Sequence, residues 1–275
     1  MWLISLSLPL LPTIIIFVYF RYHVKVASLC RRALAWAQSL MRGRVCVKDV
    51  HAFVFTNCTH GKADSVLEMF HRYAETHHTL SVGQLTARDH PPKPAVMVSG
   101  DMLDEVIKRT HPLMVLELGT HCGYSTVRML RLLPPGGRVI TVETDSVTAD
   151  LGEEIIMVAG FKHAQFQVLP CSSAEAISSL HSYLEADQSP SEGIDLVLMD
   201  HDPQQYLQDL LLLEREELLC PSGCTVLLIK RTRRDDECRE ILDYVRKEEN
   251  CYSIRTEFPQ MMEIVYRKDV QRREG

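Results

Sequence analysis

The chain has 275 residues, of which 30 are Lys or Arg and 36 are Asp or Glu, so its formal net charge is −6. With 46% hydrophobic residues, this composition excludes a disordered tail, a collagen-like chain and a small disulfide-rich scaffold. The acidic balance argues against a general nucleic-acid-binding protein. Nine cysteines without a Cys-x-x-Cys pair indicate neither a disulfide framework nor a zinc site, which fits a reducing compartment.

An uncharged apolar run from Trp2 to Phe20 opens the chain. It matches the roughly 20 residues that a helix needs to cross the hydrocarbon core of a bilayer. No basic residue precedes the run and Arg21 follows it, which favours an uncleaved anchor over a signal peptide. We therefore predict a transmembrane anchor over residues 1–22 that contacts membrane lipid.

A basic segment follows over residues 23–50, and no acidic residue lies between Arg21 and Lys48. By the positive-inside rule this flank is cytosolic. We expect a single-pass protein of the endoplasmic reticulum or Golgi, with a cytosolic domain over residues 51–270. The basic segment is either an amphipathic helix against anionic lipid or a solvated linker.

Within the domain, Asp64 is a plausible N-cap for an amphipathic helix over 65–78, and a second helix is predicted over 100–109. Three prolines between residues 91 and 94 predict a loop before that helix. Strands and helices then alternate. The predicted strands are 114–118, 138–143, 166–169, 194–200 and 224–230, and the predicted helices are 124–133, 148–159, 173–184, 206–219 and 236–248.

Several of these strands are nearly continuous apolar runs, as expected when helices cover both faces of a sheet. The pattern predicts a doubly wound parallel α/β sheet. Two further strand-like runs, 252–258 and 261–267, are separated only by Pro259 and Gln260, which predicts a closing hairpin. Such a hairpin is more typical of a methyltransferase-type sheet than of a dehydrogenase.

The strongest motif follows the strand 114–118. Gly119 and Gly123 allow the backbone to turn tightly and approach a ligand, and a helix starting near Tyr124 offers free N–H groups. Glu143 ends the next strand, where a carboxylate can accept hydrogen bonds from ribose hydroxyls. The Gly-x-x-x-Gly spacing favours an adenosine-containing ligand without a pyrophosphate. The alternative is a strand-turn-helix corner that binds no ligand.

Residues 52–268 resemble the catechol O-methyltransferase family, and most of all its vertebrate transmembrane O-methyltransferase branch. The segments that carry the resemblance are THGKADSVLE (59–68), LSVG (80–83), VLELGTHCGYSTVRM (115–129), LMDH (198–201), YL (206–207) and LLE (212–214). The resemblance implies a seven-stranded, Rossmann-like class I methyltransferase sheet that binds S-adenosylmethionine. The implied cofactor contacts are Val82, Glu117, Gly119, Tyr124, Ser125, Glu143, Ser173 and His201. His121 stands where the family usually has a Tyr.

The residues at the family's metal-binding and catalytic positions, here called the catalytic half of the site, depart from the family pattern. The family reaction uses Mg²⁺ to hold the two oxygens of a catechol, and the resemblance implies Asp200 as one metal ligand. Lys230 and Arg231 fall on the other two ligand positions, and Pro203 falls on that of the catalytic Lys. Because ammonium and guanidinium groups cannot ligate Mg²⁺, the metal and base site is degraded.

Three interpretations of this half remain open. Asp200 binds metal with unusual partners, or Lys230 pairs with Asp200 and stabilises a catecholate in place of the cation. Otherwise Lys230 and Arg231 are surface residues at a strand end, and Asp200 caps the following helix.

Two functions follow from the resemblance. The first is a membrane-anchored O-methyltransferase for catechols such as catecholamines. The second is a non-catalytic trafficking partner of transmembrane channel-like proteins in hair-cell mechanotransduction and hearing. The residues that would form such a partner interface cannot be named from the sequence.

Overall fold

The computed structural model describes residues 47–76, 95–185, 192–230, 238–257 and 260–268. The predicted anchor, most of the basic segment, the loop at 88–94, Val82 and Arg231 lie outside these residues. Within the described ranges, no helix combines the length and the apolar character needed to cross a membrane. All elements described below belong to the compact unit that begins at Val47. Residues 47–57 are helical, so the end of the predicted basic segment forms part of this unit.

A seven-stranded sheet forms the centre of this unit, with the strand order β3-β2-β1-β4-β5-β7-β6. The neighbouring strands from β3 to β5 are parallel, whereas β7 is antiparallel to both β5 and β6. The predicted doubly wound sheet with a terminal hairpin is therefore confirmed. The strands are β1 (Met114–Leu118), β2 (Arg138–Val142), β3 (Phe166–Leu169), β4 (Leu196–Met199), β5 (Cys224–Ile229), β6 (Tyr252–Glu257) and β7 (Met261–Tyr266).

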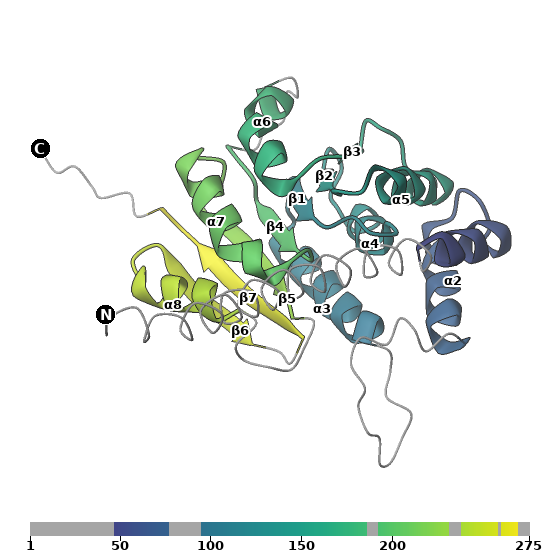
Figure 1. The fold of residues 1–275 in the computed structure, drawn as a ribbon, viewed down its shortest axis with the longest axis horizontal. Coiled ribbons are helices and arrows are strands. Elements are labelled where there is room, and N and C mark those ends of the chain that lie inside the picture. The colour runs from purple at the N-terminus through teal and green to yellow at the C-terminus, as the bar shows by residue number, and fades with distance from the viewer. Residues whose placement is uncertain (1–46, 77–94, 186–191, 231–237, 258–259, 269–275) are drawn as a thin grey trace, which may run out of the picture. The chain divides into compact units, whose positions relative to one another are not determined.

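Helices cover the sheet in two groups (Figure 1). The helices are α2 (Ala63–Thr76), α3 (Ala95–Thr110), α4 (Tyr124–Leu130), α5 (Ser146–Val158), α6 (Ser173–Glu185), α7 (Tyr206–Arg215) and α8 (Arg239–Lys247), with a short 3-10 helix η2 (Pro203–Gln205). Contacts join α2 and α3 to α4, and α4 to α5, whereas α6, α7 and α8 contact one another in sequence order.

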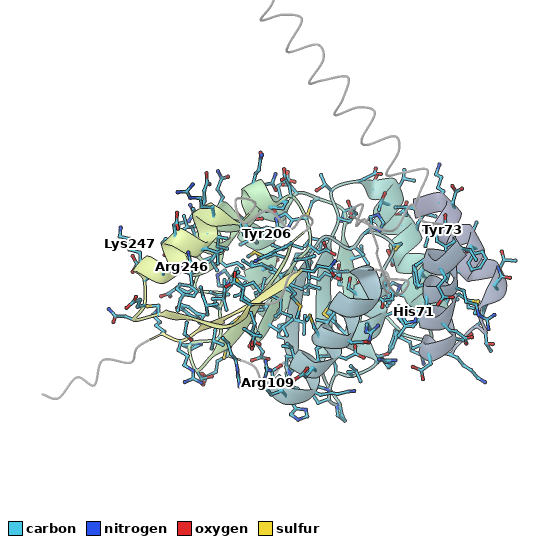
Figure 2. All side chains as sticks on the ribbon, turned by 90° about the horizontal axis from the view of Figure 1, so that it is seen from below. His71, Tyr73, Arg109, Tyr206, Arg246 and Lys247 are labelled. Atoms are coloured by element: carbon cyan, nitrogen blue, oxygen red, sulfur yellow. The ribbon has the colours of Figure 1, made fainter. Side chains whose placement is uncertain are left out.

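Strands β1, β4 and β5 are enclosed and mostly apolar, whereas alternate residues of β6 are exposed. Every residue of β1 is buried, including Glu117, as expected for the central strand of a parallel sheet. Tyr206 at the start of α7 is also fully buried, whereas Arg246 and Lys247 of α8 project from the surface (Figure 2). The packed strands hold the loops at their carboxyl ends in place.

Several predicted boundaries were wrong for local reasons. Helix α2 begins at Ala63, so Asp64 is not its N-cap but a first-turn residue paired with Arg131. Helix α3 begins at Ala95, directly after the last proline, since proline is compatible with a helix start. Helix α7 stops at Arg215 because Glu217 has a positive φ of 51°.

The chain then forms an isolated parallel bridge between Leu219 and Ile194. This bridge explains two shifted boundaries. Leu219 is not part of the preceding helix, and Ile194 lies just outside strand β4.

Candidate active site

The turn after β1 brings two strand ends together. Gly119 has a φ of 107°, and a Cβ atom at this position would lie 2.5 Å from the carbonyl oxygen of Asp200, which follows β4. Gly123 has a φ of 78° and is the N-cap of α4, and His121 between them has a φ of 48°. The predicted tight turn is therefore confirmed, and it sits at the carboxyl ends of β1 and β4, where ligands of doubly wound sheets bind.

Glu117 lies beneath this turn with none of its surface exposed. Its carboxylate accepts hydrogen bonds from the hydroxyl groups of Ser125 and Thr126, and from Thr141 Oγ1 at 2.7 Å. Burial raises the pKa of Glu117 to about 7; the three hydroxyl bonds lower it and the charge of Asp200 raises it. Glu117 and Ser125, both predicted cofactor contacts, are thus bonded to each other and tie the first turn of α4 to the sheet.

Glu143 occupies the end of β2, as predicted. Its Oε2 atom accepts a hydrogen bond of 3.0 Å from the backbone N–H of His121, and its Oε1 atom one of 3.2 Å from that of Asp145. The side chain remains partly exposed. A carboxylate has about four lone-pair sites, so Glu143 can accept further hydrogen bonds while it holds the turn in place.

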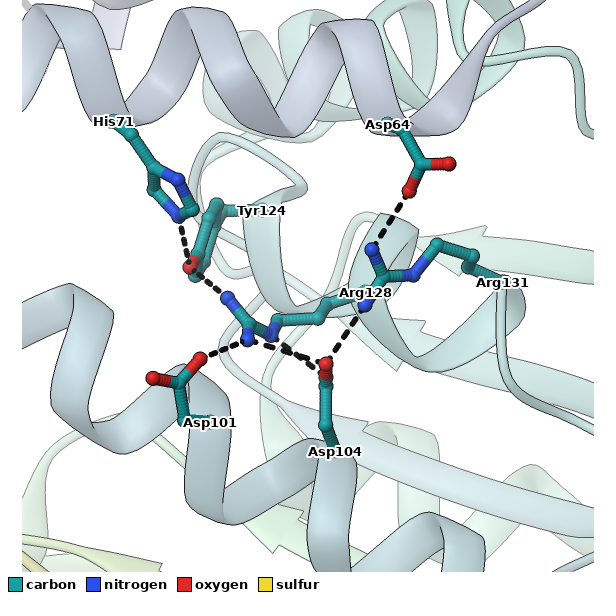
Figure 3. Close-up of polar contacts among 7 residues, drawn as sticks. All are labelled: Asp64, His71, Asp101, Asp104, Tyr124, Arg128 and Arg131. Atoms are coloured by element: carbon teal, nitrogen blue, oxygen red, sulfur yellow. Dashed lines mark hydrogen bonds and ion pairs between the residues drawn. The ribbon is translucent and has the colours of Figure 1, made fainter.

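Tyr124 directs its hydroxyl group into the helical layer rather than toward the turn (Figure 3). Its Oη atom lies 2.6 Å from Arg128 Nη1 and 3.0 Å from His71 Nε2. Burial raises the pKa of Tyr124, and burial together with the charge of Arg128 lowers the pKa of His71. The hydroxyl of Tyr124 is therefore committed to packing α4 against α2.

Arg128 is the centre of a buried polar cluster that sequence reasoning missed (Figure 3). Its side chain is 5% exposed, and it forms 2.6 Å ion pairs with Asp101 and Asp104 of α3. Arg131 extends the cluster from Asp104 to Asp64 of α2. The only sequence signal was an arginine within the apolar face of a short helix, and it does not identify partners 24 and 27 residues away.

A second missed partner lies beside His201, a predicted cofactor contact. The Nε2 atom of His201 is 2.7 Å from Oδ2 of Asp209, whose side chain is 5% exposed. The ring nitrogen Nδ1 is buried and has no hydrogen-bond partner among the described residues. Ser173, also a predicted contact, donates to Gln205 of η2 at 3.4 Å, which brings the start of α6 next to this segment.

Around Lys230 and Asp200 the structure differs from two of the three open interpretations. Lys230 pairs with Glu257 of β6 at 3.3 Å, not with Asp200 as predicted. Its side chain is only 8% exposed, so it is not an ordinary surface lysine either. Pro203 starts the helix η2, and Asp202 rather than Asp200 caps this helix by accepting from the N–H of Gln204.

The residues fit the two expected ligands differently. For Mg²⁺, the described residues contain no group of three or more His, Cys, Asp or Glu that could hold a metal ion, and an ammonium group stands at one expected ligand position. They therefore do not fit the family's metal site. For a nucleoside cofactor they do fit, because Glu143 offers a partly exposed carboxylate and His201 offers a buried ring nitrogen without a partner among the described residues, beside the tight turn that Gly119 allows.

The fold is that of a doubly wound α/β protein, with a candidate ligand site after β1, β2 and β4. The model of the O-methyltransferase family matches residues 70–219. The chain belongs to this family.

Curated relatives match parts of the chain. A rat "Transmembrane O-methyltransferase homolog" is 45% identical over 130 residues, covering 47% of this chain and 48% of that protein. The human "Transmembrane O-methyltransferase" is 44% identical over 130 residues, covering 47% and 43%. The mouse "Catechol O-methyltransferase" is 35% identical over 160 residues, covering 58% and 53%. The chain thus spans about half the length of the curated relatives that it matches.

Among solved structures, an O-methyltransferase from Bacillus cereus in complex with SAH superposes with a TM-score of 0.50. It is 18% identical, and the match covers 72% of this chain and 88% of that one. This likeness supports the fold.

Proposed function

We propose that the protein binds S-adenosylmethionine at the carboxyl edge of its sheet and is an O-methyltransferase of catechol-like substrates. The observation that carries the cofactor assignment is the tight turn at Gly119, with the Glu143 carboxylate on one side and the His201 ring on the other. The Bacillus cereus relative, which was solved with SAH, supports the same assignment.

When bound, this cofactor supplies an electrophilic methyl group on a sulfonium. The residues of the chain bind and orient it. Glu143 accepts hydrogen bonds from ribose hydroxyls. Glu117 supports the turn and the end of β2 from beneath through its bonds to Ser125 and Thr141.

Catechols are proposed as substrates because a 35% identical relative is named for them. The residue proposed to replace the metal is Lys230, whose nearly buried ammonium group follows β5. A fixed cation in a poorly solvated site can stabilise an oxyanion. It cannot chelate two oxygens as Mg²⁺ does, so turnover is expected to be slow.

Calorimetric titration of the full-length chain with S-adenosylmethionine, with and without Mg²⁺, tests the proposal, followed by methyl transfer to catechols. Micromolar binding that is indifferent to Mg²⁺, with measurable transfer, is the expected result. Binding that requires Mg²⁺ would show that a metal site survives and contradict the role of Lys230. Absence of binding would contradict the cofactor assignment.

A second function is favoured by the same departures. Pro203 provides no titratable group at the position of the catalytic base, and Lys230 replaces a metal ligand. Both changes favour a family member that has no methyltransferase activity and binds another protein. We propose transmembrane channel-like proteins as that partner, with a role in hair-cell mechanotransduction and hearing. Co-purification should then be equally strong for the wild type and for Glu143→Ala, which is designed to weaken cofactor binding. If the partner co-purifies with the wild type but not with Glu143→Ala, the interaction depends on the cofactor site.

The anchor over residues 1–22 is part of the proposal, and the names of the rat and human relatives support it. It places the protein in the membrane of the endoplasmic reticulum or Golgi with the domain in the cytosol. Alkaline extraction should leave the chain in the membrane fraction, and protease added to intact microsomes should digest the domain. Protection of the domain would contradict this topology.

A further inference from the structure

The hydroxyl group of Tyr124 lies between a donor and a histidine ring (Figure 3). Its Oη atom is 2.6 Å from Arg128 Nη1 and 3.0 Å from His71 Nε2, and these are its hydrogen-bond partners among the described residues. A guanidinium group can only donate, so Oη accepts from Arg128. The hydrogen of the Tyr124 hydroxyl group is therefore donated to His71.

This order of hydrogen bonds determines the state of His71. A neutral imidazole carries one hydrogen, on either Nδ1 or Nε2. Because Nε2 accepts from the Tyr124 hydroxyl, the hydrogen lies on Nδ1 and the ring is neutral. A protonated ring donates from both nitrogens, so the Tyr124 hydroxyl would lose its acceptor. The relay from Arg128 through Tyr124 to His71 therefore requires the neutral histidine.

The groups around His71 favour the neutral ring. Burial and then the charge of Arg128 lower the pKa of His71 below its ordinary value of 6.5. Arg131 also lowers this pKa, whereas Asp101 and Glu75 raise it. These charged groups come from α4, α3 and α2, the helices that pack together here. At neutral pH the relay is therefore intact.

Tyr124 connects the relay to the candidate cofactor site. It is the first residue of α4 and directly follows Gly123, whose φ of 78° belongs to the turn after β1. The next residue, Ser125, donates a hydrogen bond to Glu117 beneath that turn. The first turn of α4 is thus held to α2 through His71 and to β1 through Glu117. Loss of the contact with His71 would remove one of these two supports.

We infer that His71 is a proton-sensitive contact between α2 and the first turn of α4. The neutral ring accepts the Tyr124 hydroxyl and supports the turn, whereas the protonated ring repels Arg128 and weakens the packing of α2 on α4. Binding of the proposed cofactor should then weaken in mild acid. This last step rests on the proposed function, whereas the contact itself does not.

Nitrogen-15 spectra of the histidine-labelled full-length chain test the relay without ligand. The His71 signal, assigned with His71→Gln, should show the hydrogen on Nδ1 at neutral pH. Tyr124→Phe removes the hydroxyl group, and the His71 ring should then become a mixture of its two tautomers. A hydrogen on Nε2 in the wild type would mean that His71 donates to Tyr124, and the inference would be wrong.

The pH profile of cofactor affinity tests the consequence. His71→Gln keeps an acceptor for the Tyr124 hydroxyl that does not titrate. The affinity of this variant for S-adenosylhomocysteine, divided by that of the wild type at the same pH, should rise about fivefold between about pH 7 and about pH 5. Comparison at equal pH removes the titration of groups that both proteins share. His163→Gln, an exposed change, is the matched control, and its ratio should stay constant.

A ratio for His71→Gln that does not change with pH would overturn the inference, because protonation would then not affect the turn. Urea unfolding over the same range tests the contact when no ligand is present. The wild type should lose stability relative to His71→Gln as the pH falls below 6.5, because its folded state binds a proton at His71 less readily than the unfolded chain does. A stability difference that is the same at every pH would contradict a proton-sensitive contact. Failure of the wild type and both variants to bind S-adenosylhomocysteine would instead reject the proposed function, and the spectra and the unfolding would still decide how His71 acts.

Discussion

Gly119 and Asp200 are in contact through their backbones, because a Cβ atom at position 119 would lie 2.5 Å from the Asp200 carbonyl oxygen. The carbonyl belongs to a strand end and cannot rotate away as a side chain would. Absence of a side chain at Gly119 is therefore a condition for the ends of β1 and β4 to meet.

Gly119→Ala is expected to lower the free energy of unfolding by more than about 2 kcal/mol, since it adds a backbone clash to the strain of a positive φ. Binding of S-adenosylhomocysteine should fall with it. Gly61→Ala is the matched control, because Gly61 also has a positive φ, of 80°, but nothing lies within 4 Å of its Cβ position. Equal losses in both variants, measured by urea unfolding, would show that strain alone is responsible.

Glu117 should make stability depend on pH. Burial raises its pKa in the folded protein to about 7, above the ordinary value of 4.5, so the folded state binds more protons between these values. Stability must therefore fall as the pH rises through this window, by at most about 3 kcal/mol for a shift of this size.

In Glu117→Gln this fall should largely disappear, and urea unfolding from pH 4.5 to above 7 measures it. The exposed Glu68→Gln, in α2, should behave like the wild type. A decline of the same size in Glu117→Gln would mean that other groups are responsible.

The space for Arg128 depends on Gly100. A Cβ atom at position 100 would lie 2.5 Å from Arg128 Nη1 and 2.8 Å from the Tyr124 hydroxyl. Because Asp101 and Asp104 hold the guanidinium, Gly100→Ala should destabilise the protein by about 1–3 kcal/mol.

A double-mutant cycle provides the control for this prediction. Arg128→Ala alone should cost about 3–5 kcal/mol, since it leaves a buried carboxylate without its main partner. In that background Gly100→Ala should cost little. Additive losses would contradict a shared space for the two side chains.

Lys230 should matter for transfer more than for cofactor binding. We expect Lys230→Met to leave the affinity for S-adenosylhomocysteine within about twofold and to lower methyl transfer to a catechol by about tenfold or more. The exposed Lys247→Met serves as the control. A loss of stability without a specific loss of transfer would assign Lys230 to the packing of β5 against β6 through Glu257.

Chelation of divalent ions should leave cofactor affinity unchanged. The described residues offer no cluster of metal ligands, and Lys230 occupies an expected ligand position. Titrations in EDTA and in Mg²⁺ should therefore give the same dissociation constant.

The double substitution Lys230→Asp with Arg231→Asn restores the family's ligand types and should make turnover respond to Mg²⁺. No response would show that more than the ligand set is missing.

The linear order of the residues was enough to predict the sheet and the turn. The apolar runs of β1 and β5 identify enclosed strands, and the short link at residues 259–260 predicts the final hairpin. The spacing of Gly119 and Gly123 predicts the turn, because a positive φ is a local requirement that glycine meets without strain. These features depend on neighbours in the sequence, so the sequence by itself determined them.

The partners of the charged groups were decided only by the tertiary structure. Lys230 pairs with Glu257 on β6, Asp209 of α7 contacts His201 eight residues earlier, and Arg128 contacts two aspartates of α3. Each pairing depends on which face of an element is enclosed and on where a distant element packs. Outside a single helix, no fixed residue separation identifies the two partners of an ion pair. The partners therefore become known only when the tertiary structure places the elements side by side.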